Sequence, residues 1–426
     1  MTLREGGGAI LLAVTAILAV PVTVLAEETG VAAGGPVLTL EFVEKRVREN
    51  NPLVLAAQAR ARSARGMELA SAAWPAPGLG VTREDFPRPG FALNESERKS
   101  LVVSQEIPFP GKTFLAWRTS SVEAEKMEAE AGMVLQDQLF MARQMYWDLV
   151  VATASEGFYV RAAGVMDSLV TLAEKRTRFG MSGRMEQLMA PMARMEKAGL
   201  EISRLDLAQE RLEAQASLNE LLGDDPGREL AVNSTSEAPA DPGLEDAAWL
   251  ETGISESPSV AVALKDLKTM QARRAQSRAE WLPDIMLEYG AVDMKDGTRT
   301  GMATAKISLP FVWFWKTAGE YRSASEEVRA SGAELDQARL EVRRLALVEI
   351  ARLGLARKQG EIFRNEALPQ ADRALDLAVS GYQSGSIGPA DALTAVRSWL
   401  SMNLEKTMLT AQAGRSTAIL SRLRGK

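Results

Sequence analysis

The sequence predicts a mainly α-helical fold with a small transmembrane β part, built from two copies of one unit. One observation behind this fold class is a helical pattern that runs from about residue 113 to residue 178 without a proline. Another is that a short alternating segment, ending in proline, precedes this stretch at 100–109 and a similar stretch at 301–311. The order and spacing of the motifs agree across the two copies, which indicates an internal repeat.

The N-terminus predicts a Sec-type signal peptide over residues 1–26. Arg4 precedes an apolar run at 9–22, and small residues lead to a cleavage point after Ala26. The run is short for a membrane-spanning helix, so cleavage and export are favoured over the alternative of a membrane anchor. No cysteine follows the run, so the exported protein is not expected to carry a lipid.

The composition excludes several classes of protein. The chain has no histidine and no cysteine, which removes Cys/His zinc sites, thiol chemistry and histidine-dependent triads. A net charge of −6 disfavours nucleic acid as a partner. We therefore expect no enzymatic activity, and we assign no catalytic residue, no cofactor and no metal site.

The first repeat is predicted to span residues 27–222 and to begin with a helical region at 39–73. A Trp-Pro pair ends this region. Two strands are predicted next, at about 78–86 and 100–109, because apolar residues alternate there with polar or small ones.

The helix after the second strand is predicted to end at a glycine-containing break, 179–183, and a further helix then runs back to about residue 222. A rod of this length, on the order of 100 Å at ~1.5 Å per residue, favours coiled-coil packing in a helical hairpin. Its heptad seam consists of Leu135, Leu139, Ala142, Tyr146 and Leu149.

A polar linker is predicted at 223–243, and the second repeat at 244–426. The second repeat contains the same elements, with strands at about 284–294 and 301–311 and a long helical run over 317–380. A glycine-containing break and another helix complete it. The seam of the long run consists of Leu335, Ala338, Val342 and Leu345.

Four short alternating strands are typical of part of a transmembrane barrel. Because a small closed barrel needs about eight strands and lipid does not tolerate an open edge, we expect several protomers to share one barrel. Val103 and Ile107 would face lipid, and Glu106 and Lys306 would face the lumen. Aromatic residues gather at the strand ends, where an interfacial girdle would lie. They are Trp74, Phe109, Trp117, Trp281, Phe311, Trp313, Phe314 and Trp315. The alternative is a soluble α+β protein with two small hairpins.

Two motifs connect the chain with a known family. The first is QEIPFPGK at residues 105–112, and the second is Y-x-x-G followed by D-A-L within 382–393. With them the chain resembles the TolC family of outer membrane efflux proteins, and most of all its heavy-metal efflux branch. The resemblance implies a homotrimer with a shared twelve-stranded β-barrel in outer membrane lipid and a periplasmic α-barrel. It also implies a periplasmic adaptor (a membrane fusion protein) and an inner-membrane pump as partners.

The resemblance also assigns candidate site residues. Asp391 matches an acidic position that narrows the tunnel in relatives, although it equally fits the first turn of a helix after Gly388 and Pro389. Thr394 stands where some relatives carry a second acid. The residues expected at the periplasmic tip, for adaptor docking, are Gly183, Tyr382 and Gly385. Those expected at the strand-to-rod junctions are Pro108, Pro110, Gly111 and Pro310.

A stripe of methionines follows the first helical break. Packing or adaptor contact is the favoured interpretation, because methionine adapts to irregular surfaces. Handling of Cu(I) or Ag(I) by the thioethers is the alternative. The stripe comprises Met181, Met185, Met189, Met192 and Met195.

The function expected from this sequence is a passive exit duct, the outer membrane component of a tripartite efflux system, with heavy-metal cations as one substrate class. Two alternatives remain open. One is a soluble periplasmic coiled-coil adaptor of a transport complex. The other is the outer membrane duct of a type I protein secretion system. The sequence does not distinguish metal, drug and protein substrates.

Overall fold

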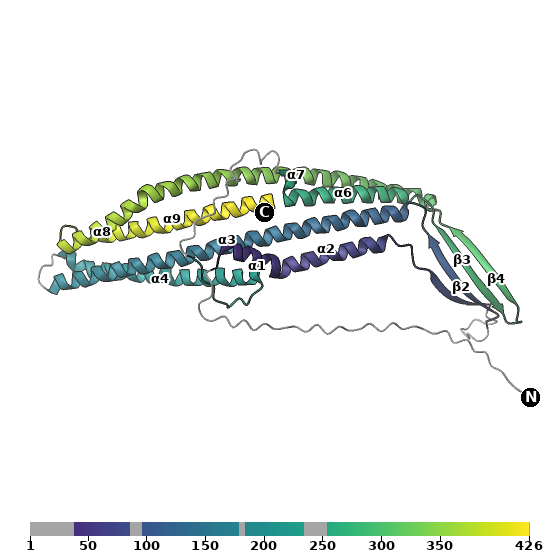
Figure 1. Ribbon diagram of the computed structural model, residues 1–426, viewed down its shortest axis with the longest axis horizontal. Helices are drawn as coiled ribbons and strands as arrows, with labels where there is room; N and C mark the ends of the chain where they lie inside the picture. Colours follow the sequence, from purple (N-terminus) through teal and green to yellow (C-terminus); the bar gives the residue numbers. More distant parts are fainter. Residues whose placement is uncertain (1–37, 86–95, 179–183, 234–253, 426) are drawn as a thin grey trace, which may run out of the picture. The chain divides into compact units, whose positions relative to one another are not determined.

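The computed structural model describes residues 38–85, 96–178, 184–233 and 254–425. The predicted signal peptide, 1–26, lies outside the described residues. Within them the chain is mostly helical with one four-stranded antiparallel sheet, so the fold class predicted for the protomer is confirmed. Figure 1 shows the sheet at one end of the helices and the turn between the last two helices at the other. Among the described helices, none has a segment both apolar and long enough to cross a membrane.

The helical region predicted over 39–73 is two helices, because the chain breaks at Asn51. A residue before proline avoids the helical conformation, and Asn51 is extended, with φ −63° and ψ 123°. Its Oδ1 accepts hydrogen bonds from the backbone N–H groups of Leu53, at 3.0 Å, and Val54, at 3.1 Å, which caps the second helix. The helices of the first repeat are α1 (Leu40–Asn50), α2 (Pro52–Ser71), α3 (Lys112–Arg178) and α4 (Arg184–Leu222).

The long helical run predicted over 317–380 is present, but a π-turn at Phe363–Ala367, with Pro369 after it, interrupts its regular α-helical bonding. Proline has no N–H to continue the helical ladder. The remaining helical elements are η2 (Ile254–Glu256), α6 (Pro258–Ala279), η3 (Pro310–Trp313), α7 (Phe314–Ile362), η4 (the π-turn), α8 (Leu368–Ser384) and α9 (Pro389–Arg424).

Both predicted seams lie in the core. In the first, Leu139, Ala142, Tyr146 and Leu149 are buried in one cluster with residues of α1 and α4, and Leu135 packs against that cluster. In the second, the buried Leu335 and Val342 meet Val260 of α6 and Leu423 of α9. Ala338 and Leu345 are partly buried against the same cluster. The heptad pattern therefore located the packing faces of α3 and α7 correctly.

The strands pair in the order β1-β2-β3-β4. They are β1 (Gly78–Glu84), β2 (Arg98–Ile107), β3 (Ile285–Met294) and β4 (Arg299–Ile307). Strands β2 and β4 end at Ile107 and Ile307, earlier than the predicted limits of 109 and 311. Pro108, directly after β2, cannot donate to a ladder, which accounts for the end of β2. After β4 the chain turns into the short helix that starts at Pro310.

The first part of the predicted linker packs against the helices. After the left-handed Gly223, with φ +72°, Asp224 accepts a hydrogen bond from Arg46 of α1 at 2.9 Å. Leu230 and Val232 pack on the core cluster of α1, α3 and α4. Only residues 223–233 of this segment are described; the rest of the linker lies outside the described residues.

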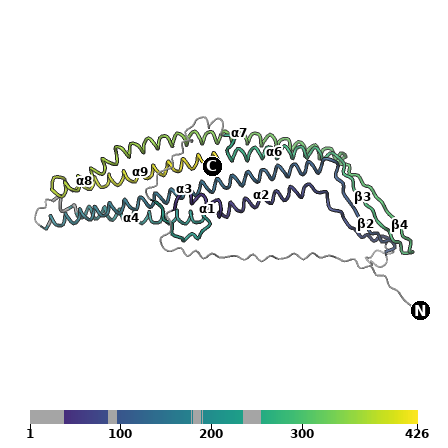
Figure 2. Tube along the Cα trace, viewed as in Figure 1, coloured from purple at the N-terminus to yellow at the C-terminus, as the bar shows by residue number. Residues whose placement is uncertain are grey.

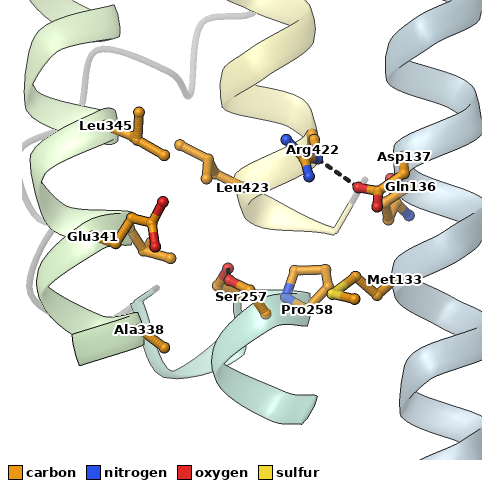
Figure 3. A pocket seen from close by; sticks show the side chains of 12 residues that line it. Met133, Gln136, Asp137, Ser257, Pro258, Ala338, Glu341, Leu345, Arg422 and Leu423 are labelled. Carbon is orange, nitrogen blue, oxygen red and sulfur yellow. Dashed lines mark hydrogen bonds and ion pairs between the residues drawn. The ribbon is translucent and has the colours of Figure 1, made fainter. Parts of the chain in front are cut away.

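A cavity of about 250 Å³ lies where the start of α6 meets the end of α9. Figure 3 shows the side chains that line it. Beside it, Arg422 donates from Nε to Asp137 at 2.6 Å. Ser257, which precedes α6, makes no capping bond with its side chain. At the matching position of the first repeat, Asn51 caps α2 and also donates to the Leu221 carbonyl at 2.8 Å. The two copies therefore share an arrangement of helices but differ in how α2 and α6 begin.

Candidate functional site

The sheet has one apolar face, as its strand register determines. Residues directly opposite one another on paired strands point to the same side, and Val103 is paired with Leu79 and Tyr289. Large side chains on this face are strongly exposed in the protomer. Glu106 and Lys306 both flank Met286 in the register and lie on the opposite face, as expected. The polar Gln105 also lies on this face, opposite Leu287. The apolar residues of the face are Leu79, Val81, Leu101, Val103, Ile107, Ile285, Leu287, Tyr289, Ala303, Ala305 and Ile307.

Glycine is required at one point on the polar face. Gly80 and Gly290 flank Val102 across the sheet. A Cβ atom on Gly290 would lie 2.3 Å from the carbonyl oxygen of Leu101 and 3.0 Å from the Cα of Val102. Glycine in a strand is typical of a close backbone approach or a bend. The backbones of β2 and β3 therefore approach this closely only without a side chain at residue 290.

The first junction between strand and rod is a tight turn held by an aspartate. Gly111 has φ +100°, which favours glycine, and α3 starts at the next residue. Asp284, just before β3, accepts from the backbone N–H of Phe109 at 3.0 Å and from Nζ of Lys112 at 2.7 Å. One carboxylate thus connects the end of β2, the start of α3 and the start of β3.

We predict that Asp284→Ala destabilises this junction by roughly 1–3 kcal/mol, because the largely buried Lys112 ammonium loses its nearest anion. The matched control is Glu280→Ala, since Glu280 lies 3.9 Å from the same ammonium and is half exposed. Exposed ion pairs contribute about 1 kcal/mol or less. Thermal melting of the purified protein in detergent compares the two variants, and equal shifts would contradict the role given to Asp284.

The second junction is richer in exposed aromatic residues. Pro310 starts the short helix η3, which leads directly into α7. Phe311, Trp313, Phe314 and Trp315 are all more than half exposed, and Trp315 packs edge-on against both Trp313 and Phe314. This cluster lies just after the end of β4, at the start of the rod. Its place beside the strand ends fits the predicted aromatic girdle.

At the opposite end, the turn between α8 and α9 is built on Gly385. Its φ of +82° lies in the left-handed region, which favours glycine. The N–H of Gly385 bonds to the Tyr382 carbonyl at 3.3 Å, and the N–H of Ser386 bonds to the Gly381 carbonyl at 2.9 Å. These two bonds form a Schellman motif that ends α8. Gly183, the residue expected at the tip of the first hairpin, lies outside the described residues.

Tyr382 is fully buried under a side chain from the first hairpin. The guanidinium of Arg176, near the end of α3, lies over its ring at 5.0 Å from the centroid. Arg176 also donates from Nη2 to the Gln383 carbonyl at 3.1 Å. This cation–π contact and hydrogen bond join the last turn of α8 to α3. The two helical hairpins are therefore tied together at the tip.

A second connection between the hairpins lies a few turns from the tip. Arg397 of α9 donates two hydrogen bonds to the Glu196 carboxylate of α4, including one from Nε at 2.8 Å. These bonds lower the pKa of Glu196 below its ordinary value. A lowered carboxyl pKa keeps the pair ionised until the pH falls below the usual carboxyl range, so the contact weakens only in acid.

Asp391 lies in the first turn of α9, and its side chain is exposed. One of its oxygens would be 3.5 Å from a Cβ atom on Gly388, the residue before the helix. This position suits an acidic residue at a helix start. The structure therefore agrees with the helix-start interpretation and leaves the carboxylate accessible for the gate role.

The methionine stripe is described only in part. Met181 lies outside the described residues, whereas Met192 and Met195 lie on α4 with exposed side chains. Across the described residues, His, Cys, Asp and Glu form no cluster of three or more suited to a metal ion. Exposed thioethers fit contact with another protein or with a soft metal, so both interpretations remain.

Sequence reasoning missed Asp284 and Arg176, the two residues that tie distant segments together at either end of the rods. Asp284 follows a Trp-Leu-Pro sequence, whose proline indicates only that a helix ends there. Arg176 belongs to a run of basic residues near a helix end, where a cation is ordinary. Their partners are more than 170 residues away along the chain, and no local pattern reports such a distance.

Comparisons with known sequences give a family match and two relatives. Residues 249–426 match the family described as outer membrane efflux protein. The cobalt-zinc-cadmium resistance protein CzcC of Cupriavidus metallidurans is 23% identical over 266 residues, 62% of this chain and 63% of CzcC. Protein CyaE of Bordetella pertussis is 26% identical over 313 residues, 71% of this chain and 65% of CyaE. Each alignment therefore spans less than two thirds of the relative's own length.

Solved structures share the fold over nearly the whole chain. The outer-membrane channel OprN superposes with a TM-score of 0.76, covering 91% of this chain and 90% of OprN, at 19% identity. At that identity the likeness concerns the fold alone.

Proposed function

Residues 249–426 belong to the outer membrane efflux protein family, and on this premise we propose that the chain forms the outer membrane channel of a tripartite efflux system. The channel is a passive duct and performs no chemistry of its own. Energy comes from the inner-membrane pump, and a periplasmic adaptor connects that pump to the tip of the rods.

The observation that carries this proposal is the matching lateral order of strands and helices. Helix α2 packs on α3, α3 on α6 and α6 on α7, in the same order as β1 to β4. One side of the row therefore ends with α2 and β1, and the other side ends with α7 and β4. Copies related by rotation can join β4 of one protomer to β1 of the next, which closes a ring. Three copies supply twelve strands, the number that the family resemblance implies.

Both open sides of the row carry exposed apolar side chains, which supports contact with a neighbouring copy. Contiguous exposed apolar surface on a protomer is typical of an interaction site. On α7 the exposed residues recur at spacings near seven, as in a coiled-coil seam. They are Leu53, Leu55, Met67 and Leu69 on α2, and Leu340, Leu347, Leu355 and Ile362 on α7.

In the assembled ring the apolar face of the sheet contacts outer membrane lipid, and the polar face lines a water-filled lumen. The aromatic cluster at 311–315 lies at the periplasmic interface, and the rods extend into the periplasm. Asp391 faces the tunnel at the tip. Gly183, Tyr382 and Gly385 shape the surface that the adaptor contacts.

Fractionation of cells that express the full chain tests the location and the assembly. We expect the protein in the outer membrane fraction, as an oligomer that persists in mild detergent and dissociates on boiling. A soluble periplasmic species would overturn the channel and favour the adaptor alternative.

The substrate class proposed is heavy-metal cations, because one relative is named as a cobalt-zinc-cadmium resistance protein. A deletion strain is expected to become sensitive to metals in a panel of cobalt, zinc, cadmium, copper and silver, and to keep its resistance to drugs. In the same strain, complementation with Met185→Leu/Met189→Leu tests the methionine stripe. Full complementation supports contact or packing, whereas selective loss of copper or silver resistance with normal assembly supports metal handling.

A further inference from the structure

The second rod consists of α7, the π-turn η4 and α8. Between its buried residues it contains one residue more than a regular helical seam would have. Helix α3 is continuous over 67 residues, whereas α7 and α8 are joined by the π-turn η4. There, the N–H of Leu368 bonds to the carbonyl of Phe363, five residues back rather than four. Pro369 then contributes no N–H to the ladder. Figure 2 shows α7 and α8 following each other beside α9.

Buried residues on both sides of the π-turn face the same partner, α9. Ala356 of α7 is buried with Ala413 and Leu420 of α9. Leu375 of α8 is buried with Val396 and Trp399 of α9, and the same cluster contains Tyr382. The packing seam of the second rod therefore continues across the interruption.

The spacing of these residues does not suit an uninterrupted heptad seam. Leu353 is buried in the same cluster as Ala356. Counted on by heptads from these two residues, a regular seam would reach Ala374 and Leu377, which are both exposed. The buried residues of α8 are instead Leu375 and Ala378, each one residue later. A π-turn takes up one extra residue, because its hydrogen bonds span five residues instead of four.

We propose that the π-turn positions the tip of the channel. By absorbing one residue, it sets the rotation of α8 so that Leu375 and Tyr382 face α9 and the ring of Tyr382 lies beneath Arg176. What the tip contacts rests on the proposed function, but the rotation of α8 can be measured without it.

Single-residue deletions and an insertion test whether the π-turn sets the rotation of α8. Deleting Asn365 should convert the π-turn into regular helix and keep the buried seam in place. Deleting Lys358, about two turns earlier, should have the same effect. Inserting one alanine after Asn365 should rotate α8 by about 100°. Deleting Gln337, which lies between the seam residues Leu335 and Val342, is the matched control and should disrupt packing.

The readout uses cysteine pairs, since the chain has no cysteine of its own. Lys175 of α3 and Gln383 of α8 are exposed and line one hollow between these helices. Both cysteines, Lys175→Cys and Gln383→Cys, are introduced into each purified variant. A short bismaleimide should then crosslink the protein without a deletion and the two proteins that lack Asn365 or Lys358. In the insertion variant, crosslinking should fall to the level of a single-cysteine control.

Retention of the crosslink in the insertion variant would overturn the proposal, because the segment would then be a loop that tolerates any length. Loss of the crosslink in both proteins that lack Asn365 or Lys358 would also overturn it. Neither result depends on efflux or on membrane location, so failure of the proposed function would be recognised separately, by fractionation and by the metal panel.

Discussion

Gly290→Ala is expected to abolish assembly of the channel. The added methyl group would lie 2.3 Å from a backbone oxygen of β2, and backbone atoms cannot move aside by changing a rotamer. Overpacking of a well-ordered site typically destabilises a protein by about 1–3 kcal/mol. We expect a clash with backbone atoms to cost at least the upper value of this range. Strands β2 and β3 must then separate or flatten, which prevents closure of a ring from curved sheets.

The matched control is Gly301→Ala on the neighbouring strand β4. Nothing lies within 4 Å of a Cβ atom at that position. The two substitutions are chemically identical, so helix or strand propensity cannot separate them. The heat-dissociable oligomer in outer membrane fractions should disappear for the first variant and remain for the second. Comparable amounts of oligomer would refute the close approach at Gly290.

Gly385→Val should have an equally large effect at the opposite end, with assembly preserved. A β-branched residue at a φ of +82° is strained by about 1–3 kcal/mol. The new side chain would also approach the Arg176 guanidinium, which lies 3.3 Å from an added Cβ. The Schellman turn and the contact between α8 and α3 should therefore be lost together. We expect loss of efflux and of adaptor crosslinking in cells.

For this prediction the control is Gly388→Ala in the same turn. Gly388 has an ordinary φ of −76°, and its nearest neighbour is an Asp391 oxygen at 3.5 Å. Normal efflux by the Gly385→Val protein would count against the tip assignment. Loss of the oligomer would instead show that the turn is needed for folding as a whole.

The two predicted failures are independent, because Gly290 and Gly385 lie at opposite ends of the rods. Substitutions that share no partners usually have additive effects. The same fractionation therefore distinguishes the two variants. The oligomer should be missing for Gly290→Ala and present for Gly385→Val.

Much of the protomer could be predicted from local pattern. The alternation of Val103 and Ile107 predicted an apolar sheet face, and the seam at Leu139 and Tyr146 predicted a buried stripe. Each depends on neighbours within one or two turns of the chain. Boundaries were less accurate at Asn51, at the strand ends and at the π-turn, where proline or a capping side chain overrides periodicity.

The amino-acid sequence by itself determined the class of fold and the apolar residues of the sheet face, because these are encoded in repeating local patterns. Only the tertiary structure decided that Asp284 binds Lys112, that Arg176 covers Tyr382 and that the seams of α7 and α8 meet on α9 through a π-turn. The reason is physical. These contacts join segments far apart in the chain, and their geometry follows from how whole helices pack rather than from the residues beside them.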